Sequence, residues 1–312
     1  MKGLFFAIAI WAFSNTVHSA ENYQRRPGVV GKAVAVGSDT MANMMTLWAE
    51  EFEKIYPQAS IEIDVTGSST APPALAEGVA NIGVMSRSMK ASEIRRFEKN
   101  YGYPPTVLRV AIDAIAIFVE DSNPLEGLTL SQIDSIFSST RYCGGRQNIT
   151  HWSQLGIDMA KPDKSIQIFG RNSVSGTHGS FKLNALCDGD FKNAVNEQPG
   201  SASVVYSVAS NHRAIGYAPF GHNIAGVKAL AVGSNTDSLI PLNHDTVTEG
   251  LYPFSRYLYL IVNKSPSQPF PSVEHEFLRF VLSKQGQEMV TKDGYFAVSE
   301  SIINQQLSLL AN

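Results

Sequence analysis

Residues 170–180 read Gly170-Arg171-Asn172-Ser173-Val174-Ser175-Gly176-Thr177-His178-Gly179-Ser180, a run of small and hydroxyl-bearing side chains beside one arginine. The alternating residues 165–169 predict a strand that ends at Gly170, and residues 181–186 predict a helix. The first N–H groups of a helix lack partners within the helix and lie at the positive end of its dipole. Small residues let an anion approach those groups, and Arg171 adds a planar set of donors. The stretch therefore predicts either an oxyanion site or an ordinary Ser/Thr helix cap beside a surface arginine.

Two earlier stretches repeat this order of strand, hydroxyl-rich turn and helix. The strand predicted at 31–36 ends at Gly37-Ser38-Asp39-Thr40, and apolar residues then recur at helical spacing over 41–55. The strand predicted at 61–65 ends at Thr66-Gly67-Ser68-Ser69-Thr70, before another helix. If the three turns converge in a cleft, they offer free N–H groups, several hydroxyls and one guanidinium to a compact anion.

Strands and helices alternate along the rest of the chain. Further strands are expected at 81–85, 107–120, 214–219, 227–232 and 257–262, and further helices at 92–100, 128–137, 201–210, 273–284 and 286–291. This alternation predicts an α/β fold with mostly parallel sheets flanked by helices. No Pro/Ser-rich linker divides the chain, so we expect two lobes joined by more than one crossing, with strands as hinges. The apolar run 107–120, interrupted by Arg109 and Asp113, is long enough for two successive strands and is a candidate crossing.

The composition bounds the class of protein. The chain has 312 residues, of which 44% are hydrophobic, and a formal net charge of −3. This suffices for one large or two medium domains and gives no basic field to attract nucleic acid. We expect no metal or other cofactor, because neither the cysteines nor the histidines have metal-ligand spacing.

The first 20 residues predict a secretory signal peptide. Lys2 precedes an apolar run from Leu4 to Phe13, and small residues follow as far as Ala20. The apolar run is too short to span a bilayer as a helix, and no other stretch approaches eighteen apolar residues. We expect an exported protein that is soluble after cleavage, monomeric and not inserted in a membrane.

Cys143 and Cys187 are the only cysteines of the chain. In an exported protein a lone pair most often forms one disulfide. Two free or reactive thiols are the alternative.

The residues 171–177 resemble the R-x-x-x-S-G-T signature of the periplasmic phosphate-binding proteins that serve ABC transporters. Residues 37–40 and 66–70 resemble the first and second phosphate loops of that family, and 215–217 and 252–256 resemble other stretches typical of it. The resemblance covers nearly the whole mature chain in the expected order. It implies a type II periplasmic binding protein with a two-lobed, Venus-flytrap architecture. Lobe 1 would comprise 24–114 and 250–312, and lobe 2 would comprise 115–249.

The same resemblance implies a function and a set of binding residues. The protein would capture inorganic phosphate between its lobes in the periplasm and deliver it to the permease of an ABC transporter in the inner membrane. It would do no chemistry on the ligand. The expected phosphate-binding residues are Ser38, Asp39, Thr40, Met41, Ser68, Ser69, Thr70, Ser86, Arg171, Ser175, Gly176 and Thr177.

One position departs from the family pattern. Many members have an aspartate after the strand that follows the second loop, whereas this chain has Ser86-Arg87-Ser88. A carboxylate there accepts a hydrogen bond from protonated phosphate and repels fully ionised sulfate. Asp39 is expected either to take this role or merely to cap the following helix. Arg87 is either a second anion contact or a surface ion-pair residue.

Other functions remain open at this point. The same fold could bind sulfate or molybdate, or could sense or buffer phosphate without feeding a transporter. A hydrolase is less favoured, because the chain has no G-x-S-x-G elbow and no S-x-x-K accompanied by K-T-G. His178, beside Thr177, is expected to be a solvent or rim histidine and not a catalytic base.

Overall fold

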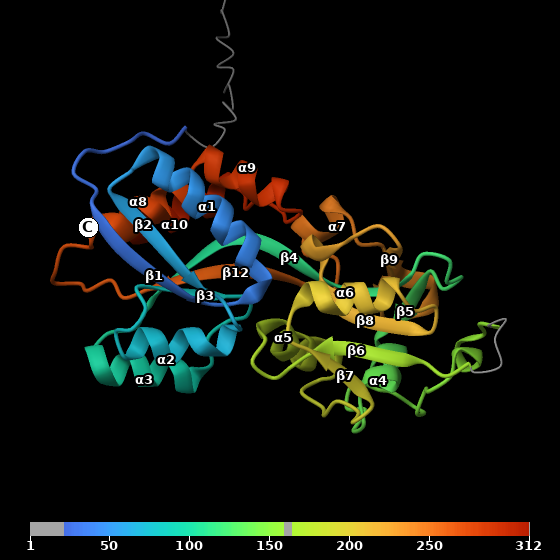
Figure 1. Ribbon diagram of the computed structural model, residues 1–312. Helices are drawn as coiled ribbons and strands as arrows, with labels where there is room; N and C mark the ends of the chain where they lie inside the picture. The colour runs from blue at the N-terminus through green and yellow to red at the C-terminus, as the bar shows by residue number, and fades with distance from the viewer. Residues whose placement is uncertain (1–21, 159–163, 312) are drawn as a thin grey trace, which may run out of the picture.

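The computed structural model describes residues 22–158 and 164–311. The signal peptide predicted over residues 1–20 lies outside the described residues. The described chain forms a two-lobed α/β fold, as predicted (Figure 1). None of its helices is both long enough and apolar enough to cross a membrane.

The strands in chain order are β1 (Gly31–Gly37), β2 (Ala59–Asp64), β3 (Ile82–Met85), β4 (Thr106–Glu120), β5 (Gly127–Thr129), β6 (Gln167–Arg171), β7 (Val195–Gln198), β8 (Ala214–Pro219), β9 (Val227–Ala229), β10 (Ala231–Gly233), β11 (Leu239–Ile240) and β12 (Ser255–Val262). The α-helices are α1 (Ala42–Ile55), α2 (Ala71–Ala76), α3 (Ala91–Tyr101), α4 (Leu130–Phe137), α5 (Gly176–Ala185), α6 (Ser201–Ala209), α7 (His244–Thr248), α8 (Ser272–Val281), α9 (Lys284–Lys292) and α10 (Glu300–Leu310). Short 3-10 helices are η1 (Asp39–Met41), η2 (Ser68–Thr70), η3 (Trp152–Leu155), η4 (Phe220–His222) and η5 (Thr236–Ser238).

Two long strands run between the lobes. The main sheet has the order β2-β1-β3-β12-β4-β8-β6-β7, with β9 beside β4. The first part of β4 pairs with β12, up to Ala114, and from Ile115 onward it pairs with β8 and then β9. The run 107–120 is therefore one continuous strand that changes partners, not two strands in succession. We call the part built on β1, β2 and β3 the first lobe and the part built on β6, β7 and β8 the second lobe (Figure 1).

The strand directions differ between the lobes and the crossing. Within each lobe β1 runs parallel to β2 and β3, and β6 runs parallel to β7 and β8. The crossing strands β4 and β12 run antiparallel to each other and to β8 and β3, respectively. The sheet is thus mixed, because the two crossing strands run in opposite directions between the parallel strands of the lobes.

A β-bulge interrupts the pairing of the crossing strands. The register shifts between Leu258 and Tyr259, opposite Arg109 to Ala111. The backbone groups released by such a bulge need other partners. Gln306 of α10 accepts from the N–H of Arg109 at 3.0 Å, and Gln287 of α9 donates to the carbonyl of Val110 at 3.0 Å. Two buried glutamines therefore tie the C-terminal helices to the crossing.

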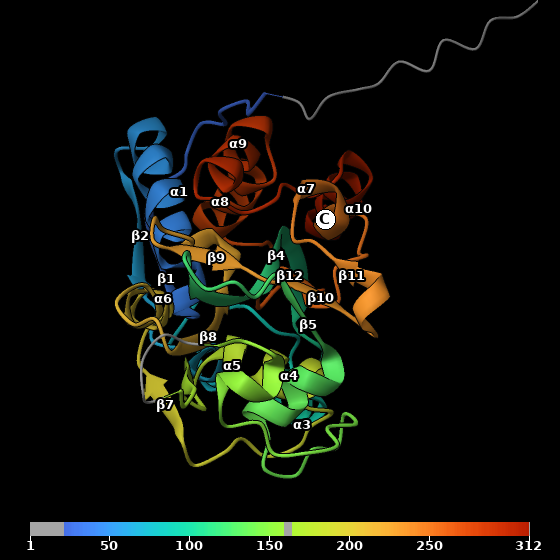
Figure 2. The same ribbon diagram turned by 90° about the vertical axis from the view of Figure 1, so that its right-hand side faces the viewer.

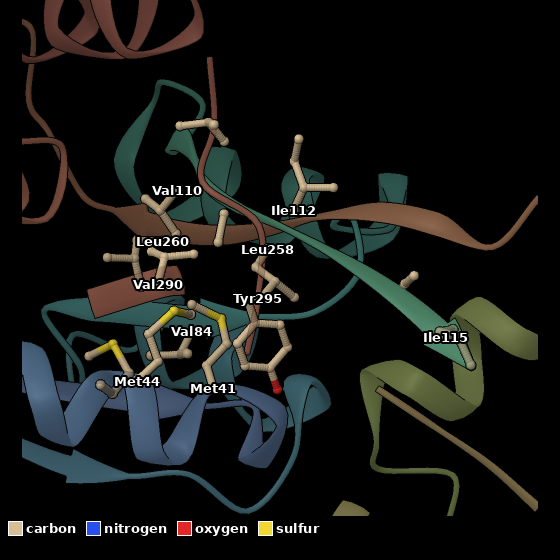
Figure 3. Packing of buried hydrophobic residues seen from close by; sticks show 14 of the residues in the cluster. Met41, Met44, Val84, Val110, Ile112, Ile115, Leu258, Leu260, Val290 and Tyr295 are labelled. Carbon is tan, nitrogen blue, oxygen red and sulfur yellow. The ribbon is translucent and has the colours of Figure 1, made fainter. Parts of the chain in front are cut away.

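The core of the first lobe lies between α1 and the crossing strands. Met41 and Met44 approach Val84 of β3, beside Leu260 of β12 and Val290 of α9 (Figure 3). Figure 2 shows α8, α9 and α10 on one side of β4 and β12, with α3, α4 and α5 on the other. The apolar stripe over 41–55 is therefore the buried face of α1.

Several elements differ from the prediction. Helices α7 and α10 and strand β7 were not expected; α7 and β7 are short, mostly polar segments that give weak periodicity. The strand expected at 227–232 is divided at Leu230 into β9 and β10, which belong to different sheets. The two cysteines form the predicted disulfide, which joins the loop after α4 to the second residue after the end of α5.

Candidate functional site

The three hydroxyl-rich turns meet between the lobes. The hydroxyl of Ser38, after β1, donates to the hydroxyl of Ser86, after β3, at 2.9 Å. The hydroxyl oxygens of Ser68 and Ser86 lie 3.2 Å apart, and those of Thr40 and Thr177 lie 3.1 Å apart. All five side chains are buried. Those of the first lobe converge because β1, β2 and β3 are parallel neighbours that present their carboxyl ends at one edge of the sheet, and Thr177 reaches them from the turn after β6 in the second lobe.

The N-terminus of α5 presses directly on the first lobe. A Cβ atom on Gly176 would lie 2.2 Å from the hydroxyl oxygen of Ser68 and 2.5 Å from that of Ser86. Only glycine fits this position. Ser175 is also the helix cap, since its hydroxyl accepts from the N–H groups of Thr177 and His178.

Arg171 lies at the end of β6 and is completely buried, so it is not a surface arginine. Its Nη2 donates to Asp39 Oδ1 at 2.8 Å and to the carbonyl of Pro199 at 2.9 Å. Its Nη1 donates to the hydroxyl of Ser201 at 2.6 Å, and its Nε donates to the carbonyl of Gln198 at 3.3 Å. Four of the five guanidinium N–H groups are thus engaged, which leaves one on Nη1.

The side chain of Asp39, a residue of the first lobe, forms hydrogen bonds with residues of the second lobe. Its Oδ2 accepts from both the N–H and the hydroxyl of Ser201 at 3.2 Å, while Oδ1 accepts from Arg171. Neither η1 nor α1 has a side-chain cap hydrogen bond. The expectation that Asp39 merely caps the following helix is therefore wrong, because its carboxylate accepts hydrogen bonds from Arg171 and Ser201 of the second lobe.

Arg87 forms an ion pair, one of the two alternatives that the sequence left open. Its Nη1 and Nη2 donate to the two carboxylate oxygens of Glu93 at 2.9 and 2.7 Å. A weaker contact of 3.4 Å joins Nη2 to the hydroxyl of Ser69. The pair is formed as in the ion-pair alternative, but the arginine is buried and does not lie on the surface.

The remaining predicted residues lie around this cluster with their backbone donors engaged. The N–H of Met41 donates to the carbonyl of Ser38 at 3.2 Å, and its side chain is part of the core. The N–H of Ser69 donates across the lobes to the carbonyl of Val174 at 3.1 Å. Thr70 uses both its N–H and its hydroxyl on the carbonyl of Gly67.

The sequence reasoning missed several neighbours of the cluster. Arg256 of β12 donates from Nε and Nη2 to Asp113 Oδ2 at 2.8 and 2.7 Å, and from Nη2 to the hydroxyl of Thr177 at 2.9 Å. The hydroxyl of Tyr295 donates to the carbonyl of Thr40 at 2.6 Å. Asp113 interrupts an apolar strand, and a charge inside such a strand was the signal that could have located this pair.

Burial changes the acid–base behaviour of the surroundings. Desolvation raises the pKa of Asp113, against the opposing effect of Arg256. It lowers the pKa of His222, which lies near Asp39 and Arg171. Within residues 22–158 and 164–311 no group of three or more His, Cys, Asp and Glu side chains is arranged to hold a metal ion. The site offers hydroxyls and two paired guanidinium groups, a set suited to a small oxyanion.

Comparisons with known proteins agree with this arrangement. The family model for the PBP superfamily domain matches residues 23–285. The chain is 50% identical over 289 residues to the phosphate-binding protein PstS of Pseudomonas aeruginosa, a match that covers 92% of this chain and 90% of the relative. A Clostridium perfringens structure, described as a phosphate ABC transporter substrate-binding protein with bound phosphate, aligns with a TM-score of 0.72 and 28% identity, over 86% of this chain and all of that one. An ABC-type phosphate transport receptor of Vibrio cholerae shares the fold, with a TM-score of 0.66 at 24% identity, over 85% of this chain and 99% of the receptor.

Proposed function

The chain belongs to the PBP superfamily and to the PstS phosphate-binding proteins within it, and on this premise we propose that it captures inorganic phosphate between its lobes and delivers it to an ABC transporter. The proposed ligands are the twelve residues expected from the sequence. We place the limits of the lobes at 114/115, where Ala114 pairs with Ser255 in the crossing strands, and at 249/250, shortly before β12 begins.

The observation that carries this proposal is the convergence of three strand-to-helix turns around the buried guanidinium of Arg171. Each charge-assisted hydrogen bond contributes about 1.5–3 kcal/mol. Several of them can offset the loss of water around a small anion with more than one charge.

The same geometry argues for binding without chemistry. The hydroxyl of Ser175 is already an acceptor for two helix N–H groups, and His178 packs its ring on Phe191 with centroids 4.6 Å apart. A hydroxyl nucleophile needs a base within hydrogen-bond reach. Neither serine nor histidine is arranged as such a pair here.

Calorimetric titration of the purified mature protein with phosphate tests the proposal, with sulfate and molybdate as competitors. We expect one phosphate per chain and weaker competition by the other anions. A protein that binds sulfate or molybdate and ignores phosphate would refute the assignment. Hydrolysis of a phosphate monoester would restore the hydrolase alternative.

We further propose that residues 1–20 direct export, and that the mature protein works as a monomer in the periplasm with a permease as partner. N-terminal sequencing of the periplasmic fraction and light scattering test the first two points. Uptake of labelled phosphate in a deletion strain tests the third. Unimpaired uptake in that strain, with phosphate binding intact in vitro, would instead favour sensing or buffering.

A further inference from the structure

A second buried guanidinium group, that of Arg256, lies next to the cluster of hydroxyl groups. Arg256 and Asp113 face each other across the crossing strands β12 and β4, and their side chains are 8% and 0% exposed. The pair lies where β4 changes partners between the lobes. Arg256 nevertheless reaches Thr177 of α5, in the second lobe.

The hydrogen bonds of Arg256 leave one end of the guanidinium free. Nε and Nη2 face Asp113, and Nη2 also donates to the hydroxyl of Thr177. Nη1 is buried and has no hydrogen-bond partner among the described residues. Because Nη1 and Nη2 share one carbon atom, the free N–H groups lie next to the Thr177 hydroxyl.

A buried cationic donor without a partner is destabilising, so an acceptor is expected at that point. Arg171, which carries the family signature, has one N–H group left, whereas Arg256 has the two of Nη1. Thr177 contacts both Arg256 and Thr40, so the free end adjoins the hydroxyls already assigned to the site.

We propose that Arg256 is a second guanidinium ligand of the bound anion, with Asp113 holding it in place from the opposite crossing strand. The inference rests on the proposed phosphate site and adds a residue to it. The anion then contacts Arg171 from the second lobe and Arg256 from the hinge strand. Removal of Arg256 therefore weakens binding without removing any of the three loops.

The test is calorimetric titration with phosphate of the wild type and of the double variant Arg256→Gln/Asp113→Asn. The double variant keeps a hydrogen-bonding pair of similar size and leaves no unpaired buried charge. We expect its affinity for phosphate to fall about 10- to 100-fold. A decrease of this size corresponds to the loss of at least one charge-assisted hydrogen bond. Arg279→Gln is the matched control, since it removes an arginine paired with buried Glu276 on α8, outside the cluster, and should bind like the wild type.

An NMR measurement on the Arg256 guanidinium group distinguishes direct contact with the anion from indirect support of the site. In protein labelled with ¹⁵N-arginine, the guanidinium resonance that is missing in the double variant should shift when phosphate is added to the wild type. Arg256→Lys serves if the double variant does not fold, because lysine keeps the charge and lacks the second nitrogen. We expect this variant to bind phosphate at least fivefold more weakly than the wild type, because it loses part of the hydrogen bonding of the guanidinium group.

The outcomes are distinct. A folded double variant, or the lysine variant in its place, that binds phosphate within threefold of the wild type would overturn the inference and leave the function intact. A guanidinium resonance unmoved by phosphate would also overturn it. A wild type that does not bind phosphate would refute the proposed function together with the inference.

Discussion

Asp39 is the carboxylate that we propose to govern the choice between phosphate and sulfate in this chain. The residues after β3 supply Ser86 and Arg87 and no carboxylate, and Arg87 is engaged by Glu93. Asp39 lies against Arg171 and is only partly exposed, at 16%. Its Oδ1 accepts a single hydrogen bond, so a lone pair remains for a proton of the ligand.

Asp39→Asn should reduce the preference for phosphate over sulfate at least tenfold, which corresponds to about 1.4 kcal/mol. An amide presents an N–H donor as well as an oxygen, so it no longer repels an anion without a proton. Competition titrations measure the ratio of the two dissociation constants. Asp190→Asn, which removes a carboxylate paired with Lys182 of α5, is the control. An unchanged ratio in Asp39→Asn would assign the selectivity to another group.

His178 should make the stability depend on pH. Burial against Phe191, with the charges of Lys182 and Arg171, lowers the pKa of His178 to about 4. The unfolded chain, in which a histidine has a pKa of about 6.5, therefore binds more protons between these values. The free energy of unfolding should fall as the pH falls from 6.5 toward 4, by on the order of 1–2 kcal/mol after allowance for partial exposure.

Urea unfolding at pH 7.5 and pH 4.5 measures this effect in the wild type and in His178→Gln. Carboxylates also titrate in this range, so the informative quantity is the difference between the two proteins. The variant should lose less stability on acidification. Equal losses in both would mean that His178 is accessible to protons in the folded protein.

At the scale of the element, α5 acts through the position of its N-terminus against the first lobe. Gly176→Ala should weaken phosphate binding about tenfold or more, because the added Cβ would overlap the hydroxyls of Ser68 and Ser86 and hold the lobes apart. The helix itself tolerates alanine at this position. Gly179→Ala, one turn further on, has its nearest neighbour at an ordinary 3.4 Å in Arg87 and should bind normally.

Titration together with thermal unfolding separates these effects. The expected result is a loss of affinity in Gly176→Ala with little change in the midpoint of unfolding. Normal affinity in this variant would mean that the two lobes need not approach this closely to bind.

The turns at the ends of β1, β2 and β6 could be predicted from the sequence because each is a local pattern. The periodicity of a strand stops, small polar residues follow, and a helical period begins. The pairing of Asp113 with Arg256 could not be predicted in this way, since the two residues are 143 positions apart and meet only through the register of two antiparallel strands. The contact of Asp39 with Arg171 likewise depends on how one lobe lies against the other.

At the scale of the molecule, the lobes are connected by two strands, and polar contacts join the turns that face each other. The contacts Asp39 to Arg171, Thr40 to Thr177 and Ser69 to Val174 all cross from one lobe to the other. Water can replace such hydrogen bonds at modest net cost. Bending of β4 and β12 near their pairing at Ala114 and Ser255 would separate the facing turns of the two lobes.

Small-angle scattering should therefore detect closure on phosphate. In the presence of phosphate the radius of gyration should be about 19 Å, the value for a compact chain of the mature length, and without phosphate it should be larger. The reason is that the anion joins Arg171 of the second lobe to the serine and threonine hydroxyls of the first, so it binds the closed form more tightly and shifts the population toward it. Gly176→Ala should remain expanded at phosphate concentrations that close the wild type. Identical scattering with and without phosphate would show that the cross-lobe contacts alone keep the protein closed, and that entry of the ligand requires only local movement of the three turns.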